Sequence, residues 1–335
     1  MKKLKFINKL IYLINYIVAI WLLLGYALPF ISPKMAPSLS VLSLTVPVLV
    51  IVNIVFVIYW LVSLKRNFLL STICLIIGYF VSSPLYIFSK NTNTAKNQLG
   101  IMNFNVRVFN QYKWLDDGKI PQKIDSFIKT ENPDILCIQE FHTSSPIDYP
   151  YKYTKTVKNS KHFGQAIYSK YKIINKGALD FKNSNNNALF VDIIKNLDTI
   201  RIYNIHLQSL GLNIKKENFG QKSSEKLLKR LSKEFVKQQD QVEQIMEHKN
   251  KSKYPVIISG DLNNTAYSWA YKQLSKNMKD SFLEAGNGFG KTFALKQIPL
   301  RIDFIFADKA FIFTEHKNYT KNYSDHEPIM AKMGI

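Results

Sequence analysis

The first 89 residues of this 335-residue chain contain no aspartate and no glutamate. The same part holds three long uncharged apolar stretches, at about residues 11–30, 38–64 and 68–88. About 20 helical residues cross the roughly 30 Å hydrocarbon core of a bilayer, so each stretch is long enough to span a membrane. A cleaved signal peptide explains the first stretch less well, because two more follow it. The sequence therefore predicts a membrane anchor over residues 1–90 with three transmembrane helices.

Basic residues set the expected orientation of this anchor. Four lysines lie within residues 2–9, and Lys65 and Arg66 separate the second and third stretches. Lysine and arginine near the ends of spans stay in the cytoplasm. We therefore expect a multi-pass protein of the bacterial inner (cytoplasmic) membrane, with everything after the third span on the extracytoplasmic or periplasmic side. Lys90 and Lys96 leave the inverted topology open.

Two features around the expected spans have simple interpretations. Asn53 lies in the middle of the second stretch and is interpreted as a helix–helix hydrogen-bonding group rather than part of a transport path. Residues 91–98 are polar, lack apolar periodicity and are expected to be a linker. A second domain, residues 99–335, follows.

Several signatures of common enzyme classes are also missing. The chain has two cysteines, Cys74 and Cys137, without a Cys-x-x-Cys pair, and no His-x-x-x-His spacing. These absences argue against structural disulfides and zinc. There is no Gly-x-Ser-x-Gly elbow, P-loop or dinucleotide fingerprint, which disfavours serine hydrolases and nucleotide-binding folds.

The charge of the chain is strongly positive. It carries 45 Lys and Arg against 24 Asp and Glu, and only seven of the basic residues precede residue 90, so the rest has a formal charge of +14 (38 against 24). Such an excess attracts polyanions or an anionic membrane surface. A solvated lysine-rich surface explains it equally well, because the lysines are scattered.

From residue 99 onward, short apolar runs alternate with helical patterns. Residues 120–130 place Ile124, Phe127 and Ile128 on one helical face, and residues 222–249 form a long basic helical pattern. Hairpin-like pairs interleave with these helices. The pattern predicts an α/β domain with a mixed sheet.

Acids, amides and imidazoles follow the apolar runs of this domain. Asp261 and Asn263 come directly after Val256–Ile258, and residues two apart in a strand point the same way. Each such residue alone has an ordinary structural explanation, but together they indicate an active site at one edge of a sheet. Oxygen ligands without a cysteine cluster favour Mg²⁺, with Mn²⁺ or Ca²⁺ as alternatives. The other members of the set are Asn105, Glu140, His206, Asp303, Asp325 and His326.

An ordered series of motifs over about residues 99–334 resembles the endonuclease/exonuclease/phosphatase superfamily. The resemblance is to the deoxyribonuclease and sphingomyelinase branches, in a membrane-anchored bacterial subgroup. It implies a four-layer α/β sandwich, with two packed mixed sheets flanked by helices. The motifs are Asn103-Phe-Asn-Val-Arg107, Leu136-Cys-Ile-Gln-Glu140, Gly164-Gln-Ala-Ile-Tyr-Ser-Lys170, Asn204-Ile-His-Leu-Gln208, Gly260-Asp-Leu-Asn263, Arg301-Ile-Asp303 and Ser324-Asp-His326.

The resemblance also implies roles for the metal and the attacking water. Glu140 would be the main Mg²⁺ ligand, with Asn105 close by and Asp325 as an outer ligand. Asp261 would orient or deprotonate the attacking water. Asn263 would hold that water or a phosphate oxygen.

Further roles concern the transition state and the substrate. Asp303 would hydrogen-bond His326 and fix its tautomer. His326 and His206 would stabilise the charge of the transition state, and one of them would protonate the leaving oxygen. Arg107, Asn187 and Arg301 are expected to bind substrate.

Departures from the superfamily's patterns bear on the substrate. Apurinic-site endonucleases carry an acid where Arg107 stands and lack a histidine at His206, so repair of abasic DNA is disfavoured. The favoured function is a metal-dependent nuclease for nucleic acid, supported by the basic charge. A phosphodiesterase or phosphatase for phospholipid headgroups is the first alternative, and a non-catalytic anchored binding module the second. No obligate protein partner is evident from the sequence.

Overall fold

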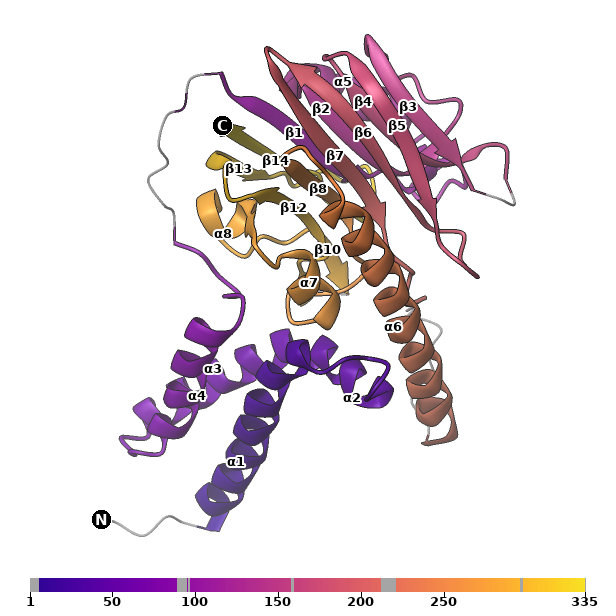
Figure 1. The fold of residues 1–335 in the computed structure, drawn as a ribbon. Helices are drawn as coiled ribbons and strands as arrows, with labels where there is room; N and C mark the ends of the chain where they lie inside the picture. The colour runs from indigo at the N-terminus through magenta and orange to yellow at the C-terminus, as the bar shows by residue number, and fades with distance from the viewer. Residues whose placement is uncertain are drawn as a thin grey trace.

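The computed structural model describes residues 6–88, 95, 97–157, 160–211, 221–295 and 298–334, and contains a helical segment and a larger α/β domain (Figure 1). In the helical segment three apolar helices pack together, and short helical turns join the first to the second. The long helices are α1 (Phe6–Ala27), α3 (Val46–Val62) and α4 (Phe68–Val81), and the short elements are η1 (Leu28–Phe30), α2 (Pro37–Val41) and η2 (Leu42–Thr45).

Two of the three expected membrane spans reach the necessary length. The helical stretches Phe6–Phe30 and Pro37–Val62 are long and apolar enough to cross a bilayer. α4 has 14 residues and ends at Val81, whereas the sequence predicted helix to residue 88. Pro84 explains the early end, because proline has no backbone N–H and disfavours helix in the residue before it.

Buried polar side chains join the three apolar helices. Ser71 of α4 donates a hydrogen bond to Asn53 Oδ1 of α3 at 2.8 Å, and Asn15 of α1 donates to Ser71 Oγ at 2.7 Å. Trp60 Nε1 of α3 donates to Asn15 Oδ1 at 3.0 Å. The interpretation of Asn53 as a helix–helix hydrogen-bonding group is confirmed. These bonds fix the register of the helices, since few alternative partners exist among apolar side chains.

Two six-stranded sheets form the centre of the α/β domain. The first has the order β13-β14-β1-β2-β4-β3 and the second β5-β6-β7-β8-β12-β9. Both are mixed, because β1–β2 and β7–β8 are parallel while the other pairs are antiparallel. The bounds are β1 (Leu99–Asn105), β2 (Ile135–His142), β3 (Tyr151–Thr156), β4 (Phe163–Ser169), β5 (Ile173–Asp180), β6 (Asn187–Lys195), β7 (Asp198–His206), β8 (Val256–Asp261), β9 (Met278–Asp280), β12 (Asp303–Asp308), β13 (Ile312–Asn318) and β14 (Ile329–Gly334).

Helices and a small hairpin complete the domain. α5 covers the outer face of the first sheet, and α6 and α7 cover that of the second. The expected four-layer sandwich is therefore confirmed. The remaining elements are η3 (Arg107–Asn110), α5 (Ile120–Glu131), α6 (Gln221–Asn250), α7 (Trp269–Leu274), α8 (Ser281–Ala285), and the hairpin β10 (Phe293–Leu295) with β11 (Ile298–Leu300).

Successive residues of a strand face opposite sides of the sheet, so they pack into two different hydrophobic cores. In β1, Leu99 and Ile101 face the other sheet, whereas Met102 and Phe104 pack under α5. α5 buries the predicted stripe that includes Ile124. On α6, Leu231 and Phe235 are buried, whereas Leu228, one turn earlier, is 38% exposed. The inner face between the sheets becomes polar toward one end, where the expected site residues lie.

The helical segment docks against the α/β domain. Tyr267, just before α7, packs among apolar side chains of α1, α3 and α4. Lys34 pairs with Asp240 at 2.7 Å and Glu243 at 2.6 Å on α6. In Figure 1 the domain sits at one end of the helices, while the start of α1 and the α3–α4 connection lie at the other. Most of the expected linker, residues 91–98, falls outside the described residues.

Candidate active site

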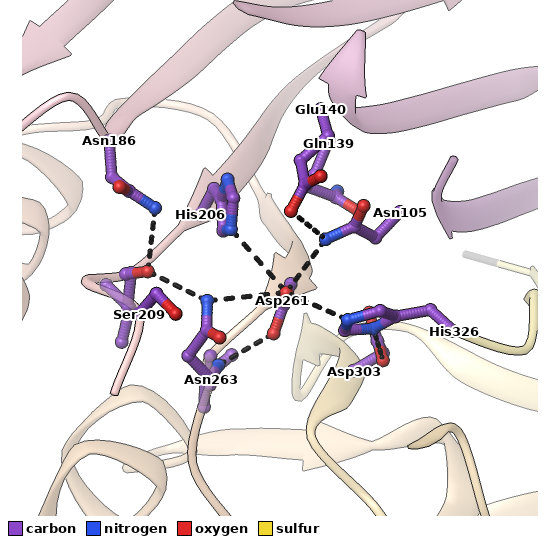
Figure 2. Close-up of polar contacts among 12 residues, drawn as sticks. Asn105, Gln139, Glu140, Asn186, His206, Ser209, Asp261, Asn263, Asp303 and His326 are labelled. Atoms are coloured by element: carbon purple, nitrogen blue, oxygen red, sulfur yellow. Dashed lines mark hydrogen bonds and ion pairs between the residues drawn. The ribbon is translucent and has the colours of Figure 1, made fainter. Parts of the chain in front are cut away.

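Five of the expected site residues lie on strands β1, β2, β7, β8 and β12, which belong to the two facing sheets. Asn105, His206, Asp261 and Asp303 continue the inward-facing positions of β1, β7, β8 and β12, which bury Ile101, Ile202, Ile257 and Ile305 between the sheets. β8 pairs His206 of β7 and Asp303 of β12 with Asp261. Strand alternation therefore carries these side chains to one point (Figure 2).

Asp261 lies at the centre of the site and is fully buried. Its Oδ1 accepts the Asn263 backbone N–H at 2.7 Å, and its Oδ2 accepts Asn105 Nδ2 at 3.1 Å. Gly260 allows this placement, since a Cβ there would lie 2.0 Å from the Ile205 carbonyl oxygen of the neighbouring strand. Burial raises the pKa of Asp261 above its ordinary value, while His326 and His206 oppose the rise.

Two imidazoles flank Asp261. His206 Nε2 and His326 Nε2 lie 3.6 and 3.7 Å from Asp261 Oδ2. His326 Nδ1 pairs with Asp303 Oδ2 at 2.9 Å. Burial lowers the pKa of His206. At His326 burial acts in the same direction, but Asp303 and Asp261 outweigh it and raise the pKa, which favours the protonated ring.

Glu140 reaches the site through a bulge in β2. The pairing of β2 with β4 shifts between Ile138 and Phe141, and Glu140 between them has a left-handed φ of 50°. An extra residue of this kind re-aims a side chain, and such strain is found where function requires it. The bulge directs Glu140 Oε1 to within 3.3 Å of Asn105 Nδ2. Asn263 also has a positive φ, of 49°.

Asp325 and Arg107 form the exposed edge of the site. Arg107 Nη1 lies 3.4 Å from Asp325 Oδ2, and its guanidinium stacks over the Trp114 ring at 4.3 Å. Arg107 begins η3, where four consecutive residues have positive φ values. Its backbone N–H donates to Asn105 Oδ1 at 3.1 Å. The expected substrate residue Arg107 is thus beside the expected outer metal ligand.

The residues present fit a divalent cation with oxygen ligands. The carboxylates of Glu140 and Asp261 converge on a single donor, Asn105 Nδ2. Burial raises the pKa of Glu140, and the nearby Asp325 carboxylate adds to the rise. A bound cation would relieve this concentration of negative charge, and carboxylate and amide oxygens suit Mg²⁺, Mn²⁺ or Ca²⁺. Oxygen and nitrogen atoms of Asp261, Asp303 and His326 also lie within 4.8 Å of one another. In that cluster Asp303 and His326 already contact each other through Oδ2 and Nδ1.

Two of the expected substrate-binding residues are held by other side chains. Asn187 is buried and accepts a hydrogen bond from Gln165 through its side chain. Arg301 is also buried, where it pairs with Asp280 at 2.6 Å and donates to Ser83 Oγ of the helical segment at 2.9 Å. The structure therefore gives both side chains structural partners, and their roles toward substrate stay predictions.

Reasoning from the sequence missed a buried amide network beneath the site. Gln139 Nε2 donates to Asn103 Oδ1 at 2.8 Å and to Asn204 Oδ1 at 2.6 Å. Asn103 Nδ2 donates to Asp303 Oδ1 at 3.2 Å, and Ser259 Oγ donates to Asn103. The network links both sheets and holds Asp303. Its signal was present in the sequence as amides at inward-facing strand positions.

Comparison with solved structures shows the same fold in proteins of low sequence identity. The human Nocturnin catalytic domain with bound sulfate is 15% identical, with 72% of this chain and 96% of that chain covered and a TM-score of 0.54. A Bacteroides vulgatus endonuclease/exonuclease/phosphatase is 18% identical, covering 72% and 100%, with a TM-score of 0.52. D. rerio TDP2 complexed with single-strand DNA product is 14% identical, covering 72% and 100%, also at 0.52. No curated protein matches this chain.

Two family matches divide the chain at the boundary seen in the fold. Residues 8–85 match a family described as a domain of unknown function (DUF8431). Residues 102–326 match the Endonuclease/Exonuclease/phosphatase family, and this match covers well over half of the chain and contains every expected site residue. The chain therefore belongs to the Endonuclease/Exonuclease/phosphatase family of phosphoester hydrolases.

Proposed function

We propose that this chain is a membrane-anchored phosphoester hydrolase in which Asp261 activates water beside a site that would hold a divalent cation. The Asp261 carboxylate carries the proposal, because it is oriented by two hydrogen bonds and flanked by two imidazoles. Mg²⁺, or Mn²⁺ or Ca²⁺, held by Glu140 with Asn105 and Asp325, would act as a Lewis acid on a phosphoryl oxygen.

The remaining residues divide the proton transfers between them. Asp261 accepts the proton of the attacking water, and Asn263 N–H and Asn105 Nδ2 fix the direction of its lone pairs. His326, protonated beside Asp303, stabilises the charge that develops on the phosphoryl oxygens and donates its Nε2 proton to the leaving oxygen. His206, on the other side of Asp261, is the second imidazole at the developing charge.

Membrane anchoring through residues 1–90 is part of the proposal, with residues 99–335 as the catalytic domain. In the most apolar 18 residues of Phe6–Phe30 and of Pro37–Val62, only 28% and 33% are buried. The core helix of a soluble protein is mostly buried instead. Large apolar side chains such as Leu13, Val55 and Phe80 face outward on α1, α3 and α4. Such a continuous apolar surface suits lipid. With 14 residues, α4 is too short for a full hydrocarbon core and would complete a third crossing only in a locally thinned bilayer.

The nuclease function favoured by the sequence has limited support. The single-strand DNA product in the D. rerio TDP2 structure shows that this fold can hold nucleic acid in a relative, and the basic charge of the domain agrees. The lining of the cleft beside the site offers a different criterion for the substrate.

The proposed function is tested with the full chain in detergent and bis(4-nitrophenyl) phosphate as the substrate. We expect hydrolysis that depends on Mg²⁺ or Mn²⁺ and stops with EDTA. Asp261→Asn should lower kcat by about 10³-fold or more, because loss of the base and of a metal-facing charge act together. Asp198→Asn, a change at an exposed acid on the far end of β7, is the matched control. Unchanged turnover in Asp261→Asn would overturn the assignment.

A further inference from the structure

The cleft that leads to Asp261 has a mixed lining. Glu140, Asn263, Asp325 and His326 supply its polar side. Its apolar residues come from three separate parts of the chain, namely Leu44, Leu210, Phe293, Leu300 and Ile302. Phe293 contacts both the polar and the apolar part of this lining. Its ring centre lies 5.1 Å from that of His326, and its backbone pairs with Leu300 across the β10–β11 hairpin.

Leu44 belongs to the helical segment and not to the catalytic domain. It lies in η2, two residues before α3 begins at Val46. Leu44 and Val41 pack with Leu210, Leu231 and Phe235 of the catalytic domain. The apolar part of the cleft is therefore continuous with the domain-facing end of the apolar helices.

The position of the cleft relative to those helices is fixed by polar contacts. Ser32 Oγ and Lys34 N both donate to Gln239 Oε1 of α6, at 2.7 and 2.9 Å. Arg301 donates to Ser83 just after α4. If α1 and α3 cross a bilayer, these contacts hold the cleft at the level where hydrocarbon gives way to headgroups.

The described lining of the cleft offers no row of cations for successive phosphates, although Arg107 lies beside Asp325 at its edge. The residues that line it, all in the described part of the chain, include no lysine and no arginine. Proteins bind nucleic acid largely through contacts of such cations with successive phosphates. An apolar surface beside a single phosphate-processing centre instead fits a molecule with one phosphate and a long hydrocarbon chain.

We propose that the substrate is a long-chain phospholipid of the surrounding bilayer. Its acyl chain would rest against Leu44, Leu210 and Leu300, and its phosphoester would reach Asp261 and His326. Water attacks phosphorus, the P–O bond to the leaving alcohol breaks, and the alcohol oxygen takes a proton from His326. The inference rests on the proposed function but adds the source and the chemical class of the substrate.

The test compares matched lipids with the full chain in nonionic detergent micelles. Dioleoyl and dibutyryl forms of phosphatidylethanolamine, phosphatidylglycerol and phosphatidic acid are offered with Mg²⁺, and headgroup or phosphate release is measured. We expect kcat/KM for at least one dioleoyl lipid to exceed that of its short-chain form by about tenfold or more, as burial of several methylenes implies.

Variants locate the chain-length preference in the cleft. Leu44→Asn and Leu300→Asn should each lower the long-chain to short-chain ratio by about tenfold, the effect of losing one buried leucine contact. The ratio is measured within one preparation, so partial misfolding of a variant cancels. Leu197→Asn, at a fully exposed leucine in the β6–β7 turn, should leave the ratio unchanged.

The outcomes separate this inference from the proposed function. A ratio near one in the wild type, or one unaffected by both cleft variants, would overturn the inference. So would cleavage of plasmid or single-stranded DNA with every lipid intact, which would establish the nuclease function instead. If Asp261→Asn leaves bis(4-nitrophenyl) phosphate turnover unchanged, the proposed function itself fails.

Discussion

At the scale of single residues, the proposed role of His326 depends on the buried carboxylate that its ring contacts. Asp303 is 1% exposed, and its two oxygens accept hydrogen bonds from His326 and Asn103. Asp303 touches neither the expected metal ligands nor the attacking water, so we regard it as a positioning residue. Its contribution is the orientation and the raised pKa of His326.

Replacing this carboxylate tests that role. Asp303→Asn should lower kcat by about 10²–10³-fold for an alkyl phosphodiester, because His326 loses the charge that keeps it protonated. The loss should be clearly smaller for a 4-nitrophenyl ester, whose leaving group needs little protonation. Steady-state kinetics on both esters measure the difference, with Asp198→Asn as control. An equal loss on the two esters would show that Asp303 acts only through the fold.

The residues of the site differ in how well sequence alone could place them. The inward-facing acids and imidazoles were predictable, because alternation after an apolar run fixes the side of the sheet on which they lie. Asn187 and Arg301 were not, because their partners Gln165, Asp280 and Ser83 are far away in the chain. A motif identifies a residue type at a strand end but not the side chain it contacts.

At the scale of elements, close strand packing and one bulge shape the site. β7 and β8 run parallel with Ile205 opposite Gly260, where the backbone approach leaves no room for a side chain. The bulge at Gln139–Glu140 turns a carboxylate out of the regular alternation of β2. Sequence alternation predicts the strands, but it cannot reveal a bulge, which depends on how the partner strand β4 is paired.

A methyl group at Gly260 should be costly. In Gly260→Ala the new Cβ would lie 2.0 Å from the Ile205 carbonyl oxygen and 2.7 Å from its side chain, so β7 and β8 must separate. We expect the free energy of unfolding to fall by about 3 kcal/mol or more, at the upper end of overpacking effects, and turnover to fall with it. Urea unfolding followed by tryptophan fluorescence measures the first.

Gly118 provides the matched control for this change. A Cβ at Gly118 would meet no atom within 4 Å, so Gly118→Ala should leave both stability and turnover near the wild-type values. Equal stability of the two alanine variants would contradict the close approach of β7 and β8.

At the scale of the whole molecule, one buried cation joins the two parts of the chain. The Arg301 guanidinium pairs with Asp280, reaches Ser83, and packs over the rings of Phe282 and Phe304 at 4.7 and 4.6 Å. Its side chain is 8% exposed. Removing one partner of a buried ion pair leaves the other charge without compensation.

Arg301→Gln should therefore destabilise the protein without a specific effect on substrate binding. We expect a loss of about 3–5 kcal/mol in the free energy of unfolding and an unchanged KM for the folded enzyme. Asp280→Asn should show a loss of similar size, and the exposed Lys253→Gln almost none. A raised KM with full stability would instead support the substrate-binding role predicted from the sequence.

The topology of the anchor is testable with single cysteines, because both natural cysteines are buried. Leu197 in the catalytic domain and Leu64 between α3 and α4 are 100% and 93% exposed. A membrane-impermeant maleimide should label Leu197→Cys on intact spheroplasts, and Leu64→Cys only after permeabilisation, because Lys65 and Arg66 keep that turn in the cytoplasm. The reverse pattern would establish the inverted topology.

The hydrogen bonds that tie Ser32 and Lys34 to Gln239 have a kinetic consequence. If the helical segment is the proposed membrane anchor, a catalytic domain fastened to it in this way does not search the aqueous volume. With a bilayer lipid as substrate, encounters occur by lateral diffusion in two dimensions, and the rate follows the mole fraction of that lipid in the membrane. Its abundance per unit of surface, rather than its amount per litre, then sets the speed of the reaction.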